Sequence, residues 1–145
     1  MTIEWKEAYS TGSETIDVQH RALFKYTNQL GQSVAEGISS GRDVDNLMGI
    51  LTGYAAAHFL YEEGCMRQHQ CLLHKKNIHE HEWFRQQVAV FSQRLANERP
   101  RLQVLRELHE MLENWLVMHI VEVDSTLRDK VKKPCGPGHK PLPQT

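Results

Sequence analysis

The apolar residues of this chain recur every three or four positions over four long segments, which is the spacing of one face of an α-helix. The fourth segment shows the pattern clearly, with Leu105, Leu108 and Leu112 in line. No segment shows a convincing two-residue alternation of apolar and polar side chains, so no strand is predicted. We expect four helices, over residues 17–37, 43–66, 72–97 and 100–131.

The segments between these helices are short and contain residues that end or begin helices. "GISSGRD" contains two glycines and ends in Asp43, a candidate N-cap, and Pro100 suits the first turn of a helix. Short connections place successive helices antiparallel. The predicted fold is therefore all-α, an up-down-up-down four-helix bundle in one domain over residues 1–131. The domain begins with an irregular N-terminal arm, and the Pro/Gly-rich tail 132–145 is expected to be disordered.

Composition and charge argue against several classes of binding partner. The chain has 145 residues and a net charge of −1, so it has no overall field that would attract nucleic acid. No apolar run is long enough to span a bilayer, and "MTIEWKEAYS" lacks the basic-then-apolar pattern of a signal peptide. No two cysteines have the close spacing that is typical of a zinc site. We expect a cytoplasmic protein with neither nucleic acid nor a membrane as partner. His69, His109 and His139 are expected to face solvent.

Six polar residues lie on the apolar stripes, where the core should be. Burying such a group without a partner costs roughly 1–3 kcal/mol, and a lone carboxylate costs more. A single buried histidine is usually a core residue with a hydrogen-bond partner, but six polar groups on four helices must pair with one another or share a cation. Imidazole and carboxylate ligands inside a bundle suit iron or manganese. The six are His20, His58, Glu62, Asn77, His81 and His119.

The spacing of these residues supports some ligands better than others. His58 and Glu62 are one turn apart, so both reach the same region of the core. Asp124 follows His119 by five positions, which is about 140° of rotation on an ideal helix. Asp124 would need a locally adjusted turn to reach that region, so periodicity alone supports it weakly.

Four short motifs together resemble the hemerythrins, specifically bacterial hemerythrin domains. They occur in order on the four predicted helices, and the resemblance covers roughly residues 3–131. The N-terminal "IEWKEAYSTGSETIDVQH" is also similar in character. The motifs are "DVQH" (17–20), "HFLYEE" (58–63), "HEHEWF" (79–84) and "HIVEVD" (119–124).

The resemblance implies a non-heme di-iron centre: two iron ions with carboxylate bridges and an oxo or hydroxo bridge. It implies that His20 and His58 bind one iron and that His81 and His119 bind the other. Glu62 and Asp124 would bridge the two ions, because the family has an HxxxxD motif at 119–124. Glu63, about 100° around the helix from Glu62, is expected to point elsewhere.

The chain departs from the family pattern at position 77. The third helix of a hemerythrin carries HxxxH, and the first histidine of that pair is Asn77 here. One interpretation is an open or water-filled position beside Asn77, or weak ligation by its carbonyl oxygen. A second is substitution by His74 or His79, although His74 lies two turns, about 10.8 Å, before His81 on an ideal helix. A third is a lost or single-metal site.

Three functional hypotheses follow. The first is reversible dioxygen binding for storage, delivery or oxygen and redox sensing, without catalysis; a sensor would need a separate, unidentified protein partner. The second is a di-iron enzyme with peroxidase, oxidase or nitric-oxide-handling activity that uses an open iron position beside Asn77. The third is a scaffold, or a zinc or iron store, without di-iron chemistry. In the first two, the ligand is dioxygen or another small diatomic or peroxide molecule.

Overall fold

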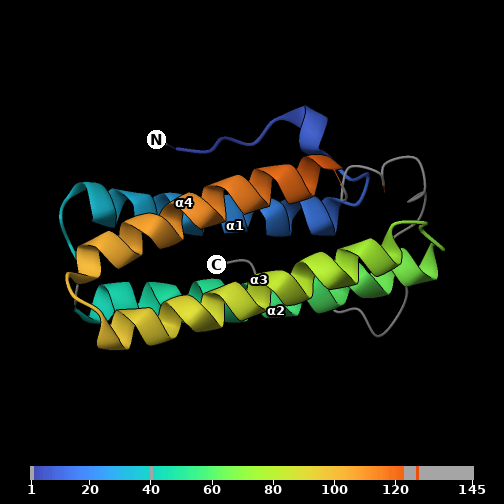
Figure 1. Cartoon of the computed structure of the whole chain (residues 1–145). Coiled ribbons are helices and arrows are strands. Elements are labelled where there is room, and N and C mark those ends of the chain that lie inside the picture. Colours follow the sequence, from blue (N-terminus) through green and yellow to red (C-terminus); the bar gives the residue numbers. More distant parts are fainter. Residues whose placement is uncertain (1, 40, 123–126, 128–145) are drawn as a thin grey trace.

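The computed structural model describes residues 2–39, 41–122 and 127, and in this part of the chain it contains helices and no strand. The described residues form a short 3-10 helix in the N-terminal arm, followed by four long helices (Figure 1). They are η1 (Glu7–Tyr9), α1 (Glu14–Ala35), α2 (Arg42–Gln68), α3 (His74–Asn97) and α4 (Arg101–Glu122). The predicted tail and the predicted end of the domain at 131 lie outside the described residues.

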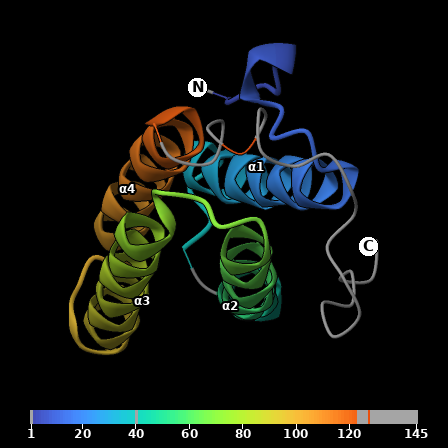
Figure 2. The same ribbon diagram turned by 90° about the vertical axis from the view of Figure 1, so that its right-hand side faces the viewer.

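The four helices pack side by side in a ring. Contacts join α1 to α2, α2 to α3, α3 to α4, and α4 back to α1. Figures 1 and 2 show α1 beside α4, with α2 and α3 below them, and successive helices run in opposite directions. The predicted all-α, up-down-up-down four-helix bundle is confirmed.

Local capping residues set where the helices begin, and one of them differs from the residue predicted from the sequence. The α1 helix begins before residue 17 because the Ser13 side chain caps it and accepts a hydrogen bond from the Ile16 N–H at 3.3 Å. The prediction that Asp43 caps α2 is wrong. Gly41 is the N-cap, at φ +108°, in the left-handed region that favours glycine. The predicted end of α4 lies outside the described residues.

The core is apolar along most of the bundle and polar near one end. Leucines and aromatics from all four helices form the main cluster, including Leu30, Leu51, Phe91 and Leu108. A smaller apolar cluster has Ile16, Met66 and Leu127 among its members, and these residues are near the buried polar residues in the sequence. These two clusters leave the buried histidines between apolar layers, where water has little access.

The N-terminal arm is fixed to the bundle. Trp5 and Tyr9 pack against Phe24 of α1, with ring centroids 6.3 and 6.1 Å away. The loop before α1 is held by Asp17, whose carboxylate accepts hydrogen bonds from the Thr11 N–H at 2.8 Å and the Ser10 hydroxyl at 2.7 Å. This loop positions the start of α1, and with it His20.

His109 is buried, which contradicts the expectation that it faces solvent. It is 9% exposed and packs against α1 at Gly31. A Cβ atom at Gly31 would lie 2.4 Å from His109 Nε2, so only glycine leaves room for the ring. The close approach of α1 and α4 therefore depends on this glycine. His69 is partly buried, and His139 lies outside the described residues.

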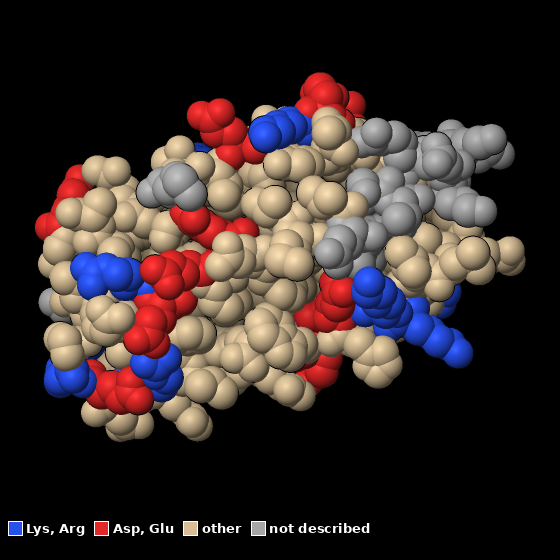
Figure 3. Space-filling model, turned by 45° about the horizontal axis from the view of Figure 1, so that its top comes forward, with Lys and Arg blue, Asp and Glu red and all other residues tan. Residues whose placement is uncertain are grey.

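Charged residues are mixed in sign on the face of the molecule shown in Figure 3, where acidic and basic side chains lie among many uncharged ones. This agrees with the net charge of −1. Among the described residues, no helix has both the length and the apolarity that a membrane crossing needs.

Candidate metal centre

Every long helix contributes to one buried polar cluster. His20 comes from α1, His58 and Glu62 from α2, His81 from α3 and His119 from α4. None of the five is more than 4% exposed. Such groups are found together inside a protein only when they satisfy one another or bind an ion.

Glu62 is the centre of the cluster, and its two carboxylate oxygens face different helices. Oε2 lies 3.0 Å from His20 Nε2 and 3.4 Å from His58 Nε2. Oε1 lies 3.1 Å from His81 Nε2 and 3.7 Å from His119 Nε2. One carboxylate therefore joins a pair of imidazoles on α1 and α2 to a pair on α3 and α4.

The ligand atoms form two groups that share Glu62. His20, His58 and Glu62 make one group, and Glu62, His81 and His119 make the other; in each, the ligand atoms lie within 4.8 Å of one another. Two histidines and a shared carboxylate on each side are a donor set that suits a pair of iron or manganese ions. The residues present thus fit a two-metal centre with Glu62 as a bridge.

The charges in the cluster hold Glu62 ionised. Burial raises the pKa of this carboxyl, but the charge of His58 and hydrogen bonds from His119, His20 and His58 outweigh burial and hold the pKa well below its usual value. Burial lowers the pKa of His81, but the carboxylates of Glu62 and Glu63 raise it above its usual value overall. The metal-free cluster therefore favours protonated imidazole beside carboxylate, and a metal ion must displace that proton.

Three further residues contact the outer nitrogens of the ligand histidines. His58 Nδ1 lies 2.6 Å from the Gln19 side-chain oxygen, and His119 Nδ1 makes a very short contact with Glu80 Oε2. His81 Nδ1 lies 3.6 Å from Glu63 Oε1, which is an ion-pair distance and too long for a hydrogen bond. Hydrogen-bonded partners such as Gln19 and Glu80 fix the ring orientation and tautomer of a metal-binding histidine.

Gln19 and Glu80 were not predicted from the sequence as site residues, although each immediately precedes a predicted ligand histidine, His20 or His81. That adjacency was the available signal. Glu63 does point away from the shared carboxylate position, as expected, but it faces the outer side of His81.

Aromatic rings enclose the α3 and α4 histidines. Phe59 stacks on His81 with centroids 3.9 Å apart and an interplanar angle of 10°, and Trp115 stacks on His119 at 4.5 Å and 9°. Phe84 contacts both Phe59 and Trp115. These rings keep both imidazoles in place and exclude water from their faces.

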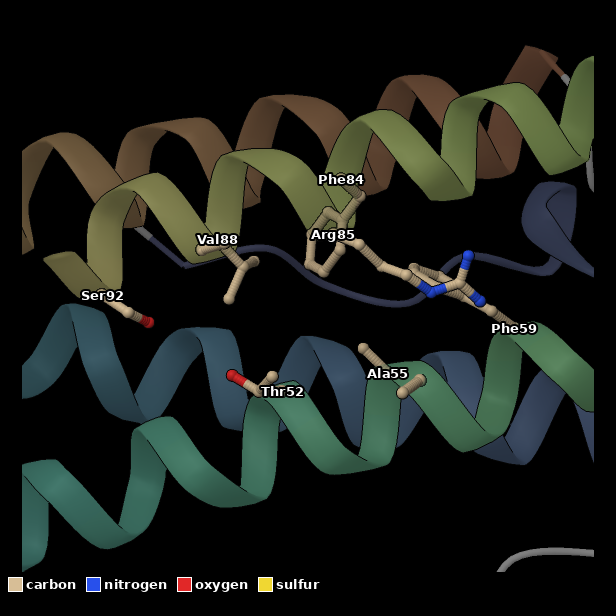
Figure 4. A pocket seen from close by; sticks show the side chains of 9 residues that line it. Thr52, Ala55, Phe59, Phe84, Arg85, Val88 and Ser92 are labelled. Carbon is tan, nitrogen blue, oxygen red and sulfur yellow. The ribbon is translucent and has the colours of Figure 1, made fainter.

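An apolar cavity lies between α2 and α3 next to this aromatic wall. Its volume is about 260 Å³. Figure 4 shows Phe59 at one end and Ser92 at the other, with Phe84 and Ala55 on opposite sides between them and the Arg85 side chain extending from α3 toward Phe59. The Arg85 guanidinium lies 5.4 Å from the centre of the Phe59 ring. Phe59 is thus in contact both with the cavity and with His81.

The other predicted site residues have different positions. Asn77 is fully buried in the cluster and its Nδ2 donates to Glu62 Oε1 at 3.0 Å. His74 begins α3 and, among the described residues, belongs to neither metal-ligand group; His79 is exposed. Asp124 lies outside the described residues, so its predicted role as second bridge stays a prediction.

Comparison with known proteins supports this site. Residues 11–131 match the model of the family described as "Hemerythrin HHE cation binding domain". A bacteriohemerythrin of Stenotrophomonas maltophilia is 31% identical over 135 residues, 88% of this chain and 80% of that protein. Bacteriohemerythrins of Pseudomonas aeruginosa and Pseudomonas paraeruginosa are each 28% identical over 134 residues, with the same coverage.

The family match spans most of the bundle, including the five clustered residues. Hemerythrins bind a non-heme di-iron centre, and the two ligand groups that share Glu62 suit such a centre. The chain therefore belongs to the hemerythrin family.

Proposed function

We propose that this protein binds two non-heme iron ions and uses them to bind dioxygen reversibly, for storage, delivery or oxygen and redox sensing. The observation that supports this most strongly is the pair of buried ligand groups that share Glu62. His20 and His58 would hold one ion, His81 and His119 the other, and Glu62 and Asp124 would bridge them. Held by these residues, two ferrous ions would supply the two electrons that reversible dioxygen binding needs.

The surroundings of the centre support binding in preference to uncontrolled oxidation. Phe59 and Trp115 cover the faces of His81 and His119, and burial of all four histidines excludes water and protons. Dioxygen is small and apolar, so the cavity against Phe59 offers it a favourable environment next to the centre.

Iron quantitation combined with absorption spectroscopy tests the proposal. Properly loaded protein should hold about two irons per chain, and its reduced, oxygenated and azide-treated forms should show the bands of a bridged di-iron pair. Glu62→Gln should lose the spectrum of the pair, whereas Glu110→Gln, an exposed carboxylate on α4, should keep it. Clearly fewer than two irons in loaded wild-type protein would contradict the proposal.

A second candidate function is catalysis on peroxide or nitric oxide at a position beside Asn77. The observation that favours it is the amide at position 77, where the family motif has an imidazole. Asn77→His should then suppress turnover and lengthen the lifetime of the oxygenated protein. Turnover no higher than that of free iron, or unchanged by the substitution, would eliminate this candidate.

We also propose a cytoplasmic location. A sensor would act through a separate protein partner. Fractionation of cells that express the chain with its native N-terminus tests the location.

A further inference from the structure

Asn77 has one satisfied end and one unsatisfied end. It is fully buried, one turn before His81 on α3, and its Nδ2 donates a 3.0 Å hydrogen bond to Glu62 Oε1. No donor among the described residues lies within hydrogen-bond distance of its carbonyl oxygen, Oδ1. Buried carbonyl oxygens in proteins are as a rule hydrogen-bonded, so this acceptor indicates a missing partner.

The orientation of the amide follows from its neighbour. Glu62 Oε1 lies 3.0 Å from Asn77 Nδ2, and a carboxylate oxygen is a hydrogen-bond acceptor. If the amide were rotated by half a turn, Oδ1 would face a carboxylate oxygen and two acceptors would repel each other. The NH₂ group therefore faces Glu62, and Oδ1 is directed elsewhere as an acceptor.

The side chain at position 77 is smaller than the one in the family pattern. In the family pattern an imidazole ring lies at this position, and an asparagine side chain is shorter than that ring. A small polar molecule can take up the difference if it finds hydrogen-bond partners. Oδ1 is such a partner for a molecule with an O–H or N–H group.

We propose that Asn77 makes the α3 side of the centre a site for a small ligand that carries a proton, with water at rest and hydrogen peroxide as the exchanging ligand. This inference rests on the proposed di-iron centre and names a class of ligand for its α3 side; dioxygen itself carries no proton and gains nothing from Oδ1. A ligand with an O–H group satisfies Asn77 Oδ1. An aprotic anion such as azide leaves Oδ1 without a partner and gains nothing from it.

The expected discrimination is the cost of one buried, unsatisfied acceptor. That cost corresponds to about 5- to 150-fold in affinity, or about 1–3 kcal/mol. This discrimination between ligands should be confined to the α3 side of the centre. Asn77 belongs to α3, whereas His20 and His58 on the other side belong to α1 and α2.

A crystal structure of the iron-loaded protein tests the resting state without any measure of activity. We expect an ordered solvent oxygen within hydrogen-bond distance of Asn77 Oδ1. Oδ1 bound directly to a metal ion, or no ordered solvent beside it, would overturn the proposal.

Ligand titration tests the selectivity. Hydrogen peroxide and azide are titrated into the diferric protein and binding is followed by stopped-flow absorption before turnover. Asn77→Leu, which removes the acceptor at similar size, should weaken peroxide binding about 5- to 150-fold and change azide binding less than about 3-fold. Asn77→His should fill the position and abolish the preference.

Thr27→Val is the matched control. Thr27 is buried on α1 with a hydroxyl that has no hydrogen-bond partner among the described residues. The substitution removes a buried polar group outside the candidate centre and should leave both affinities unchanged. An equal effect in Thr27→Val and Asn77→Leu would show that the loss is unspecific and would overturn the inference.

The outcomes separate this inference from the function on which it depends. If wild-type protein does not load two irons or lacks the spectrum of a pair, the proposed function fails. If it loads iron normally but Asn77→Leu keeps the wild-type ratio of peroxide to azide affinity, only the role of Asn77 fails.

Discussion

The two halves of the candidate metal centre share Glu62 but differ in the groups behind their histidines. On the α1 and α2 side, His58 is backed by the neutral amide of Gln19. On the α3 and α4 side, His81 and His119 are backed by the carboxylates of Glu63 and Glu80.

This difference indicates how a site with one histidine fewer than the family pattern can remain suited to a metal. An imidazole whose outer N–H faces a carboxylate is a more basic ligand than one whose N–H faces an amide. Within the part of the chain that the structure describes, two carboxylates lie behind the histidines of the half in which Asn77 replaces a histidine. We infer that Glu63 and Glu80 strengthen the two imidazoles that remain there.

Removing the shared carboxylate should have the largest effect, because it breaks both halves at once. We expect Glu62→Ala to lower iron affinity more than about 100-fold, since even outer partners of metal ligands contribute 10- to 100-fold. Competition with a chelator measures the affinity. Glu110→Ala should bind iron like wild type, and a Glu62→Ala protein that keeps two tightly bound irons would show that the carboxylate is no bridge.

Neutralising one anionic partner should affect one half only. Glu80→Gln is expected to weaken iron binding about 10- to 100-fold at the α3 and α4 half, because His119 loses its carboxylate. The hydrogen bond from His119 holds the pKa of Glu80 below its usual value, despite partial burial, so the wild-type group is charged. Stepwise iron titration should show one weakened site and one normal site.

Glu82→Gln controls for the loss of a charge on α3, because Glu82 is exposed. Equal weakening in Glu80→Gln and Glu82→Gln would indicate a general charge effect and remove the distinction between the halves.

Restoring the histidine should make the halves more nearly alike in binding strength. We expect Asn77→His to tighten iron binding at the α3 and α4 half by about tenfold, equivalent to about 1.4 kcal/mol. The same stepwise titration measures it. Unchanged affinity would mean that the new imidazole does not reach the ion, and that the position beside Asn77 is not a ligand position of that ion.

The smallest expected effect is a pH dependence of the metal-free protein. The lowered pKa of Glu62 gives a stabilisation that is present above the unfolded carboxyl pKa and lost as pH falls through the folded value. The raised pKa of His81 gives one that is present below the unfolded histidine pKa and lost as pH rises through the folded value. Their joint contribution should therefore be largest between about pH 4.3 and 6.5.

Denaturant unfolding of metal-free protein across this range measures the effect, and iron-loaded protein provides the contrast. A bound metal needs neutral imidazoles, so the loaded protein should gain stability as pH rises toward neutral. If metal-free and loaded protein show the same pH profile, the histidines are not exchanging protons for metal.

Much of the fold and of the ligand set could be predicted from the sequence, because helical periodicity is local. Every third or fourth residue lies on one face, so the stripes already placed His20, His58, Glu62, His81 and His119 toward the core. The same reasoning predicted a buried Asn77. The resemblance to hemerythrins added the pairing of these residues.

Other features depended on how the helices approach and rotate against one another. His109 was expected in solvent and is buried, because Gly31 lets α1 and α4 come close. Gln19 and Glu80 lie off the predicted ligand positions, yet each contacts a histidine 39 residues away in sequence. The sequence alone determined which residues share a face, since that follows from the geometry of one helix. Only the tertiary structure decided which outer group backs which histidine and which end of Asn77 is left unsatisfied, because those contacts join different helices.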